Sequence, residues 1–187
     1  MAERLTREAV VARAADLADE IGLSEITITK LGRALGIAPP GVYRHVTDLP
    51  DLRHAISAHA AREATGVLTA ATAGLAGRDA LAALGDTLRS WAREHPGRYA
   101  ALQIAPDLDD VTGQQAAGGL LAVFAAVLRA YTLTGDDLTD AVRLIRSTLH
   151  GFAMLELGEG FKTLRSLDAT YAKIIESLDT VFTAWSS

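Results

Sequence analysis

The side chains best suited to chemistry lie between Ile26 and Thr47. This segment contains no Asp or Glu, while Lys30, Arg33 and Arg44 give it a local charge of +3 within a chain of net charge −5. A cationic surface of this kind on an acidic protein is suited to a polyanion such as nucleic acid. Three positive charges in so short a segment also arise by chance, so charge alone does not decide between the two interpretations.

Two short helices joined by a turn must position these side chains. Thr27 is a suitable helix N-cap, and Gly36 supplies the positive φ that a turn after residue 35 needs. The pattern therefore predicts helices over 28–35 and 39–46, with the small Gly32 where they approach. This spacing is typical of a helix-turn-helix, whose second helix enters the DNA major groove. Two core helices joined by a glycine turn are the alternative.

The rest of the chain is also predicted to be helical. Alanine, the strongest helix former, accounts for 35 residues, and Val, Ile and Thr never form alternating strand-like runs. Further helices are expected over 7–21, from 50 into 69–74, and over 78–94, 98–105, 112–132, 136–157 and 166–184. The fold class is therefore all-α, with an N-terminal three-helix helix-turn-helix domain joined by a long helix to a larger helical domain.

Composition and motifs argue against other classes of protein. The chain has no cysteine, no HExxH, P-loop or GxSxG motif, and no histidine pair at i,i+3 or i,i+4 spacing. Asp107, Asp109 and Asp110 suit either a hard cation or a solvated loop that caps the next helix. We expect no catalytic residue, metal or cofactor. No signal segment or uninterrupted apolar stretch of membrane-spanning length is present, so a cytoplasmic protein is expected.

Several stretches carry a resemblance to a known family. The N-terminal ones are Ile26-Thr27, Leu31, Leu35-Gly36-Ile37, Gly41-Val42-Tyr43-Arg44-His45-Val46 and Leu52. Through them, residues 5–56 resemble the DNA-binding domain of the TetR family of transcriptional regulators. The later ones are Trp91-Ala-Arg-Glu-His-Pro-Gly-Arg-Tyr99 and Leu149-His-Gly-Phe-Ala-Met-Leu-Glu-Leu-Gly-Glu-Gly-Phe161. They resemble a TetR-type regulatory domain known by a Trp-His-Gly tripeptide, in which Leu149 here replaces the Trp.

The resemblance implies that Tyr43 and His45 hydrogen-bond DNA phosphates, although packing against the first helix and a helix-end role are their alternatives. Arg44, the only long donor on the second helix, suits a guanine edge or a phosphate, and the prolines suit a thymine methyl. The start of the helix over 28–35 favours a phosphate through its N–H groups and dipole. The predicted DNA-binding residues are Thr27, Thr29, Lys30, Pro39, Pro40, Gly41, Tyr43, Arg44 and His45.

This chain departs from the family pattern at two positions near the second helix. Ala38 stands where the family usually has a polar residue, and Leu49 where it usually has a Lys that pairs with a phosphate. Asp48 and Asp51 lie close by and are expected to add repulsion. DNA affinity should therefore be modest at physiological salt.

Helical bundles build ligand pockets between facing helices, so a family member is expected to hold an effector there. The predicted ligand-binding residues are Trp91, Tyr99, Leu102, Phe124, Leu128, Arg146, His150 and Phe152. Arg146 and His150 share a helix face, and a buried Arg146 would need Glu156 or a ligand carboxylate as partner. Core packing is the alternative for the aromatic members.

The last two predicted helices carry long apolar stripes. TetR-like proteins use two such helices from each subunit as a four-helix interface, and one short recognition helix reads too few bases alone. The predicted interface residues are Leu138, Val142, Ile145, Tyr171, Ile174, Leu178 and Phe182.

These expectations define a one-component transcriptional regulator. Residues 1–56 would bind palindromic operator DNA, and residues 57–187 would bind a small-molecule effector and form a homodimer. Release of DNA on effector binding would make the protein a repressor. The alternative is a helical ligand-binding or interaction protein with weak or no DNA binding. Basic residues of the N-terminal arm favour the first function, and only Arg4 and Arg7 are present.

Overall fold

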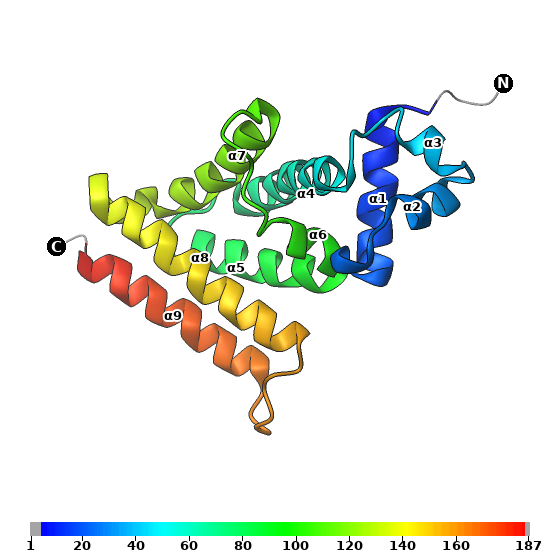
Figure 1. Cartoon of the computed structure of the whole chain (residues 1–187). Helices are drawn as coiled ribbons and strands as arrows, with labels where there is room; N and C mark the ends of the chain where they lie inside the picture. The colour runs from blue at the N-terminus through cyan, green and yellow to red at the C-terminus, as the bar shows by residue number, and fades with distance from the viewer. Residues whose placement is uncertain (1–4, 186–187) are drawn as a thin grey trace. The chain divides into compact units, whose positions relative to one another are not determined.

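The computed structural model describes residues 5–185, which exclude Arg4, and within that range it is helical and contains no strand. Its α-helices are α1 (Arg7–Ile21), α2 (Ile28–Leu35), α3 (Pro39–Val42), α4 (Leu49–Thr72), α5 (Gly77–Glu94), α6 (Pro96–Ala101), α7 (Val111–Leu128), α8 (Gly135–Leu157) and α9 (Leu167–Trp185) (Figure 1). The predicted all-α fold class is confirmed.

The helices pack as two units. Unit 1 contains residues 5–63 and 94–119, and unit 2 contains residues 64–93 and 120–185. Both α4 and α7 therefore belong partly to each unit, and we describe each unit by itself. The predicted division at residue 56 is a division by function, whereas these two units are defined by packing. The functional division therefore stays a prediction.

Local capping signals set the first two helices. Thr6 accepts a hydrogen bond from the amide of Ala9, and Thr27 accepts one from the amide of Lys30. Gly36 ends α2 in the left-handed conformation, with a φ of 68°. Because these signals are local, both helices have the predicted bounds.

The third helix is shorter than predicted. It covers Pro39–Val42 and is followed by a turn, whereas the sequence indicated a helix to about residue 46. Pro39 and Pro40 set the start, but they lack N–H groups and add no helical hydrogen bond. A helix this short depends on tertiary contacts for its position.

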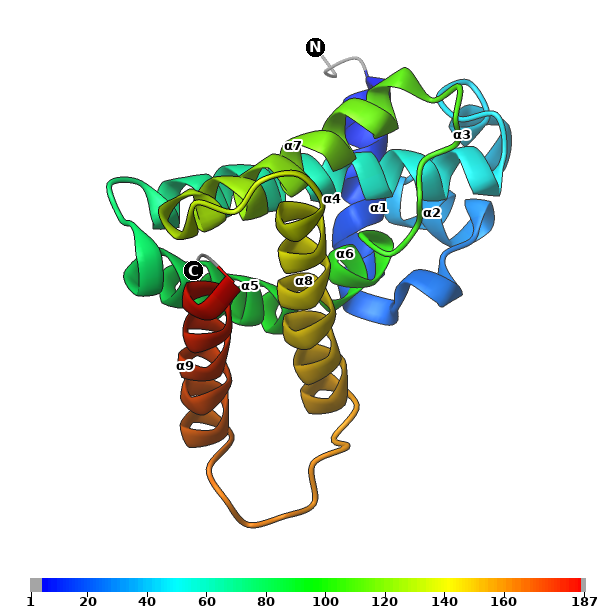
Figure 2. The same cartoon turned by 90° about the vertical axis from the view of Figure 1, so that its left-hand side faces the viewer.

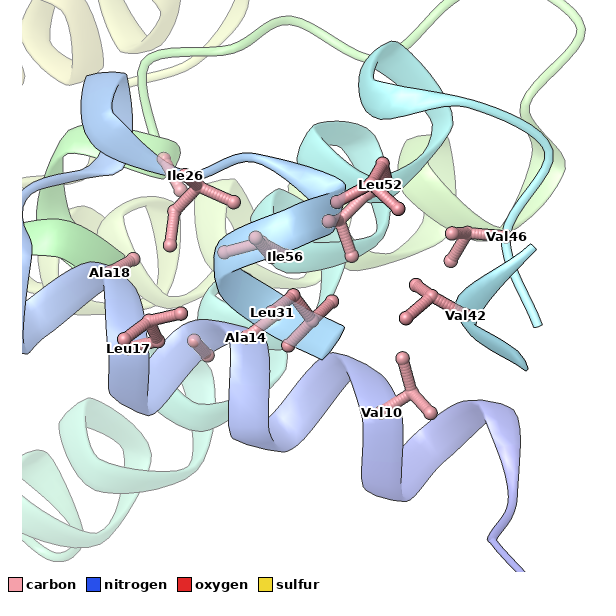
Figure 3. Close-up of a cluster of buried hydrophobic side chains, with 13 residues drawn as sticks. Val10, Ala14, Leu17, Ala18, Ile26, Leu31, Val42, Val46, Leu52 and Ile56 are labelled. Carbon is pink, nitrogen blue, oxygen red and sulfur yellow. The ribbon is translucent and has the colours of Figure 1, made fainter. Parts of the chain in front are cut away.

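One apolar core holds α1, α2, α3 and the start of α4 together. Figure 3 shows its members meeting from all four helices, with Val10 and Ala14 on α1, Leu31 on α2 and Leu52 on α4. Val42, at the end of α3, is fully buried in it. The core therefore fixes the base of the third helix while its other face remains exposed.

Unit 1 also contains a polar junction between α1, α4 and α6. Arg98 is 7% exposed and pairs with Asp16 and Asp19 of α1 and with Glu63 of α4. Asp19 also accepts the Arg98 backbone N–H at 2.8 Å. Next to it, a Cβ on Gly97 would overlap backbone atoms of Ala18, so α6 and α1 meet backbone to backbone (Figure 2).

Unit 2 contains a half-buried arginine at a junction with aromatic walls. Arg89 of α5 forms a two-pronged ion pair with Glu156 of α8, with N–O distances of 2.8 and 2.6 Å. Its third carboxylate contact is Asp168 of α9 at 2.8 Å. The guanidinium lies 5.2 Å from the ring centre of Phe152 and 4.9 Å from that of Tyr171. One side chain thus joins α5, α8 and α9, the last two of which run side by side (Figure 2).

One helical segment of the described chain, Val111–Tyr131, is long and apolar enough to cross a membrane by length and composition, with a mean hydropathy of 1.5. We expected no such segment because polar residues such as Gln114 and Arg129 interrupt its apolar run. Core helices of soluble proteins satisfy the same test, so it is weak evidence for a membrane span.

Candidate nucleic-acid interface

The helix-turn-helix is closely packed at its turn. A Cβ on Gly32 would lie 2.8 Å from the Ile37 carbonyl oxygen and 3.5 Å from Val42 Cγ2. Only glycine therefore allows α2 this close to the start of α3. The predicted reason for a small residue at position 32 agrees with this geometry.

The predicted DNA-binding residues lie on the surface of this motif. Thr27, Thr29, Lys30, Pro40, Tyr43 and Arg44 are exposed, and Pro39, Gly41 and His45 are half-buried. Tyr43 keeps 55% of its surface accessible, so its ring is not part of the core against α1. The structure thus presents a hydrogen-bonding phenol beside a guanidinium, and their contact with DNA stays a prediction.

Two of these residues already have partners within the chain. Lys30 Nζ lies 2.9 Å from a carboxylate oxygen of Glu25, and the Thr27 hydroxyl caps α2. The Glu25 ion pair is exposed on both sides and is therefore weak. DNA phosphates could compete for Lys30 at little cost.

The acidic residues before α4 have a structural role that we did not expect. Asp48 accepts the Asp51 amide, and Asp51 accepts the Thr47 amide at 2.7 Å, so both carboxylates satisfy free N–H groups around the helix start. A hydrogen bond from Arg7 holds the pKa of Asp51 below its usual value, with smaller help from Thr47. Asp51 is thus a partly neutralised carboxylate, and the repulsion assigned to it must be smaller than predicted.

Arg7, which the sequence offers only as a basic residue of the N-terminal arm, begins α1 and has partners within the chain. It donates to the His45 carbonyl oxygen and pairs with Asp51 at 2.6 Å. The partners lie 38 and 44 residues away, so no local pattern indicates them. Leu49, where the family usually has Lys, is half-buried and packs against the core of unit 1.

A groove of about 1030 Å³ lies in unit 1. Residues of α1, α4 and the segment 107–112 line it, including the Arg7–Asp51 pair and a 3.2 Å contact between His54 and Asp107. None of the eight predicted ligand-binding residues lines this groove. Among the residues that the structure describes, no group of three His, Asp or Glu is arranged to hold a metal ion.

The predicted ligand-binding residues are divided between the units. Tyr99 and Leu102 belong to unit 1, and the other six belong to unit 2, where Trp91, Phe124, Leu128 and Phe152 are buried. Their role in a pocket stays a prediction.

Arg146 is not the buried arginine for which Glu156 or a ligand carboxylate was the expected partner. Arg146 is exposed, because it lies outside the buried stripe of α8, and Glu156 pairs with Arg89 instead. His150 is half-buried, and burial, aided by the charge of Arg146, lowers its pKa. At neutral pH His150 is therefore the neutral member of this helix face.

All seven residues predicted at the dimer interface are partly or wholly covered by their own chain. Ile145, Tyr171, Leu178 and Phe182 are buried, whereas Leu138, Val142 and Ile174 are half-buried. Tyr171 also donates to the Gly85 carbonyl oxygen at 2.7 Å, inside unit 2. Only the half-buried set keeps side-chain surface for a second subunit.

Comparison with known proteins identifies the class. Residues 81–178 match the family described as the Tetracyclin repressor-like, C-terminal domain. A helix-turn-helix-type transcriptional regulator of Mycobacterium tuberculosis is 36% identical over 155 residues, which cover 82% of this chain and 71% of the relative. A second such regulator, from Bacillus subtilis, is 24% identical and covers 84% of this chain and 82% of the relative. The chain therefore belongs to the TetR-like family of transcriptional regulators, which are DNA-binding proteins and not enzymes.

Solved structures share the fold. A TetR regulator from Streptomyces coelicolor matches with a TM-score of 0.75 at 19% identity, covering 98% of this chain and 100% of that chain. A TetR variant from Acinetobacter baumannii AYE in complex with minocycline matches with a TM-score of 0.74 at 18% identity, covering 98% of this chain and 99% of that one.

Proposed function

We propose that the protein is a cytoplasmic repressor that binds a palindromic operator as a homodimer and leaves it when a small molecule binds. The observation that carries the proposal is the exposed group of Tyr43, Arg44 and half-buried His45 directly after the third helix of a closely packed helix-turn-helix. Side chains at this place in the motif meet phosphates and base edges. Residues 1–56 would read DNA, and residues 57–187 would bind the effector and the second subunit.

The dimer surface is proposed on the accessible side of α8 and α9. Beside the buried stripes run Leu144, Leu155, Ile174 and Val181, all at least partly exposed. Two copies of these stripes would form a four-helix contact that covers them. This surface includes Ile174 of the predicted set.

The effector is proposed to be a small, mainly apolar molecule. A solved relative in this family binds minocycline, which supports a small-molecule ligand. The buried Trp91, Phe124 and Phe152 would form apolar walls, with His150 as a neutral hydrogen-bonding group. The segment Leu149-His150-Gly151 supports a regulatory domain of the Trp-His-Gly type, with Leu149 buried in place of Trp.

A second candidate function is ligand binding without useful DNA affinity. The ion pairs of Lys30 with Glu25 and of Arg7 with Asp51 favour it, because they reduce the charge offered to phosphates.

One experiment separates the two functions. The purified chain is used to select DNA from a random pool, and binding to the enriched and a scrambled sequence is measured at several salt concentrations. We expect the selection to enrich a palindromic sequence that two chains bind. Sedimentation of the free protein measures whether the two chains already form a dimer in solution. Arg44→Ala should lower affinity for the enriched sequence by roughly 1–3 kcal/mol more than for the scrambled one. Tyr43→Phe should weaken both equally.

The matched control is Lys162→Ala, which removes one positive charge from an exposed residue after α8. It should leave both affinities unchanged. A selection that enriches no sequence would support the second function.

A further inference from the structure

The backbone that carries the proposed DNA contacts has little support of its own. After α3, the Tyr43 amide bonds to the Pro39 carbonyl at 3.2 Å, and the amides of His45 and Val46 both bond to the Val42 carbonyl. No further helical turn follows, because the chain turns toward α4. Side chains on so short a segment are ordered only where other elements hold it.

Val46 anchors this segment in the apolar core, and two polar contacts add support from outside the helix-turn-helix. Arg7 of α1 donates to the His45 carbonyl oxygen, and its guanidinium pairs with Asp51 of α4 at 2.6 and 3.2 Å. Asp51 accepts the Thr47 amide at 2.7 Å. The segment from His45 to Thr47 is therefore held by a carbonyl contact on one side and an amide contact on the other.

We infer that Arg7 and Asp51 are positioning residues for DNA binding, which act by holding the backbone between His45 and Thr47. The inference rests on the proposed function and concerns a different step, the ordering of the surface before DNA arrives. Ordering a surface in advance removes an entropic cost from binding. A carboxylate on the DNA-facing part of the molecule would then raise affinity for a polyanion.

A positioning role and a simple charge role predict opposite changes in DNA affinity for the substitution Asp51→Asn. If Arg7 served as a phosphate contact, Asp51→Asn would release it and remove a negative charge, so affinity would rise on every sequence. If the pair positions the segment, Asp51→Asn breaks the ion pair, and affinity falls. We expect a loss of about tenfold, the scale of one charge-assisted hydrogen bond.

The test uses the full chain and the DNA enriched in the selection above, with Arg7→Gln, Asp51→Asn and the double variant. Both single variants should lose affinity, and the double variant should lose no more than either, because the residues act as one unit. The slope of the logarithm of the binding constant against the logarithm of the salt concentration should equal that of the wild type. Loss of a phosphate contact would instead reduce the magnitude of this slope by about one.

The matched control is the pair Arg13→Gln and Glu20→Gln, which removes a 2.8 Å ion pair from the same α1 helix. Thermal unfolding checks that every variant folds, and amide exchange should accelerate at 45–47 only in the Arg7 and Asp51 variants. Asp51→Asn protein that binds as well as or better than wild type would overturn the inference alone. A wild type that binds no sequence would overturn the proposed function and this inference with it.

Discussion

Each unit places an arginine at a junction of three helices, buried in unit 1 and half-buried in unit 2, but the two junctions surround it differently. In unit 1, the Arg98 side chain is 9% exposed and meets three carboxylates, from Asp16, Asp19 and Glu63. In unit 2, the Arg89 side chain is 11% exposed, and the rings of Phe152 and Tyr171 lie beside it. The first junction is almost purely polar, whereas the second is an ion pair within an apolar wall.

The difference indicates which junction depends on its charge. Without Arg98, carboxylates from α1 and α4 would face one another with no cation between them. Without the Arg89–Glu156 pair, aromatic rings would remain to contact an apolar replacement. Replacing a buried ion pair by apolar side chains is often tolerated, while removing one partner leaves a buried charge uncompensated.

The largest effect is expected for Arg98→Met. The variant should lose about 3 kcal/mol of unfolding free energy, the lower end of the cost of an uncompensated buried charge, because Asp19 is half-buried and loses its cation. Denaturant unfolding of the full chain measures it. Arg13→Met, which breaks an exposed pair on the same helix, should cost under about 1 kcal/mol. Equal losses in the two variants would show that the polar junction does not depend on its charge.

An intermediate effect is expected on the acid dependence of unfolding when the Arg89–Glu156 pair of unit 2 is broken. The hydrogen bond from Arg89 lowers the pKa of Glu156 below its ordinary 4.5. The stability from this pair is therefore fully present above about pH 4.5 and is lost as pH falls through the lower, folded-state pKa. Unfolding measured from pH 6 downward should show a shallower acid loss in Arg89→Met than in wild type. Arg143→Met, at an exposed pair with Asp140, should follow the wild-type curve.

The smallest effect is expected for the double variant Arg89→Met with Glu156→Leu. Its unfolding free energy should lie within about 1 kcal/mol of wild type, since apolar side chains can pack against the two rings. The corresponding double variant in unit 1, Arg98→Met with Asp19→Leu, should remain strongly destabilised. Asp19 also accepts the Arg98 amide and contacts His95, and a leucine at position 19 offers neither group an acceptor. Similar values for both double variants would remove the distinction between the junctions.

Local signals explain what the sequence could predict. Thr6, Thr27 and Gly36 act within a few residues of their own position, so the bounds of α1 and α2 followed from them. The length of α3 did not, because its end depends on Val42 in the core and on Arg7 from another helix. Predicting a helix to residue 46 assumed that helical spacing continues wherever nothing stops it.

Charge partners were the least predictable part of the candidate site. The sequence offers Glu156 or a ligand carboxylate as a partner for Arg146, but Glu156 pairs with Arg89, which lies 67 residues away. The sequence suggests that Asp51 adds repulsion toward DNA, but its carboxylate is paired with Arg7. Residue type indicates that a buried charge needs a partner, and only the folded chain determines which one.

The contact of Gly97 with Ala18 has a consequence for how this sequence can change during evolution. Any side chain at position 97 would overlap the α1 backbone, which cannot rotate aside as a side chain can. By contrast, a Cβ on Gly66 of α4 or Gly118 of α7 meets no described atom within 4 Å, and alanine is the better helix former there. Descendants of this protein should therefore accept substitutions at those two glycines and retain Gly97. The rate of substitution should accordingly be lower at position 97 of α6 than at position 118 of α7.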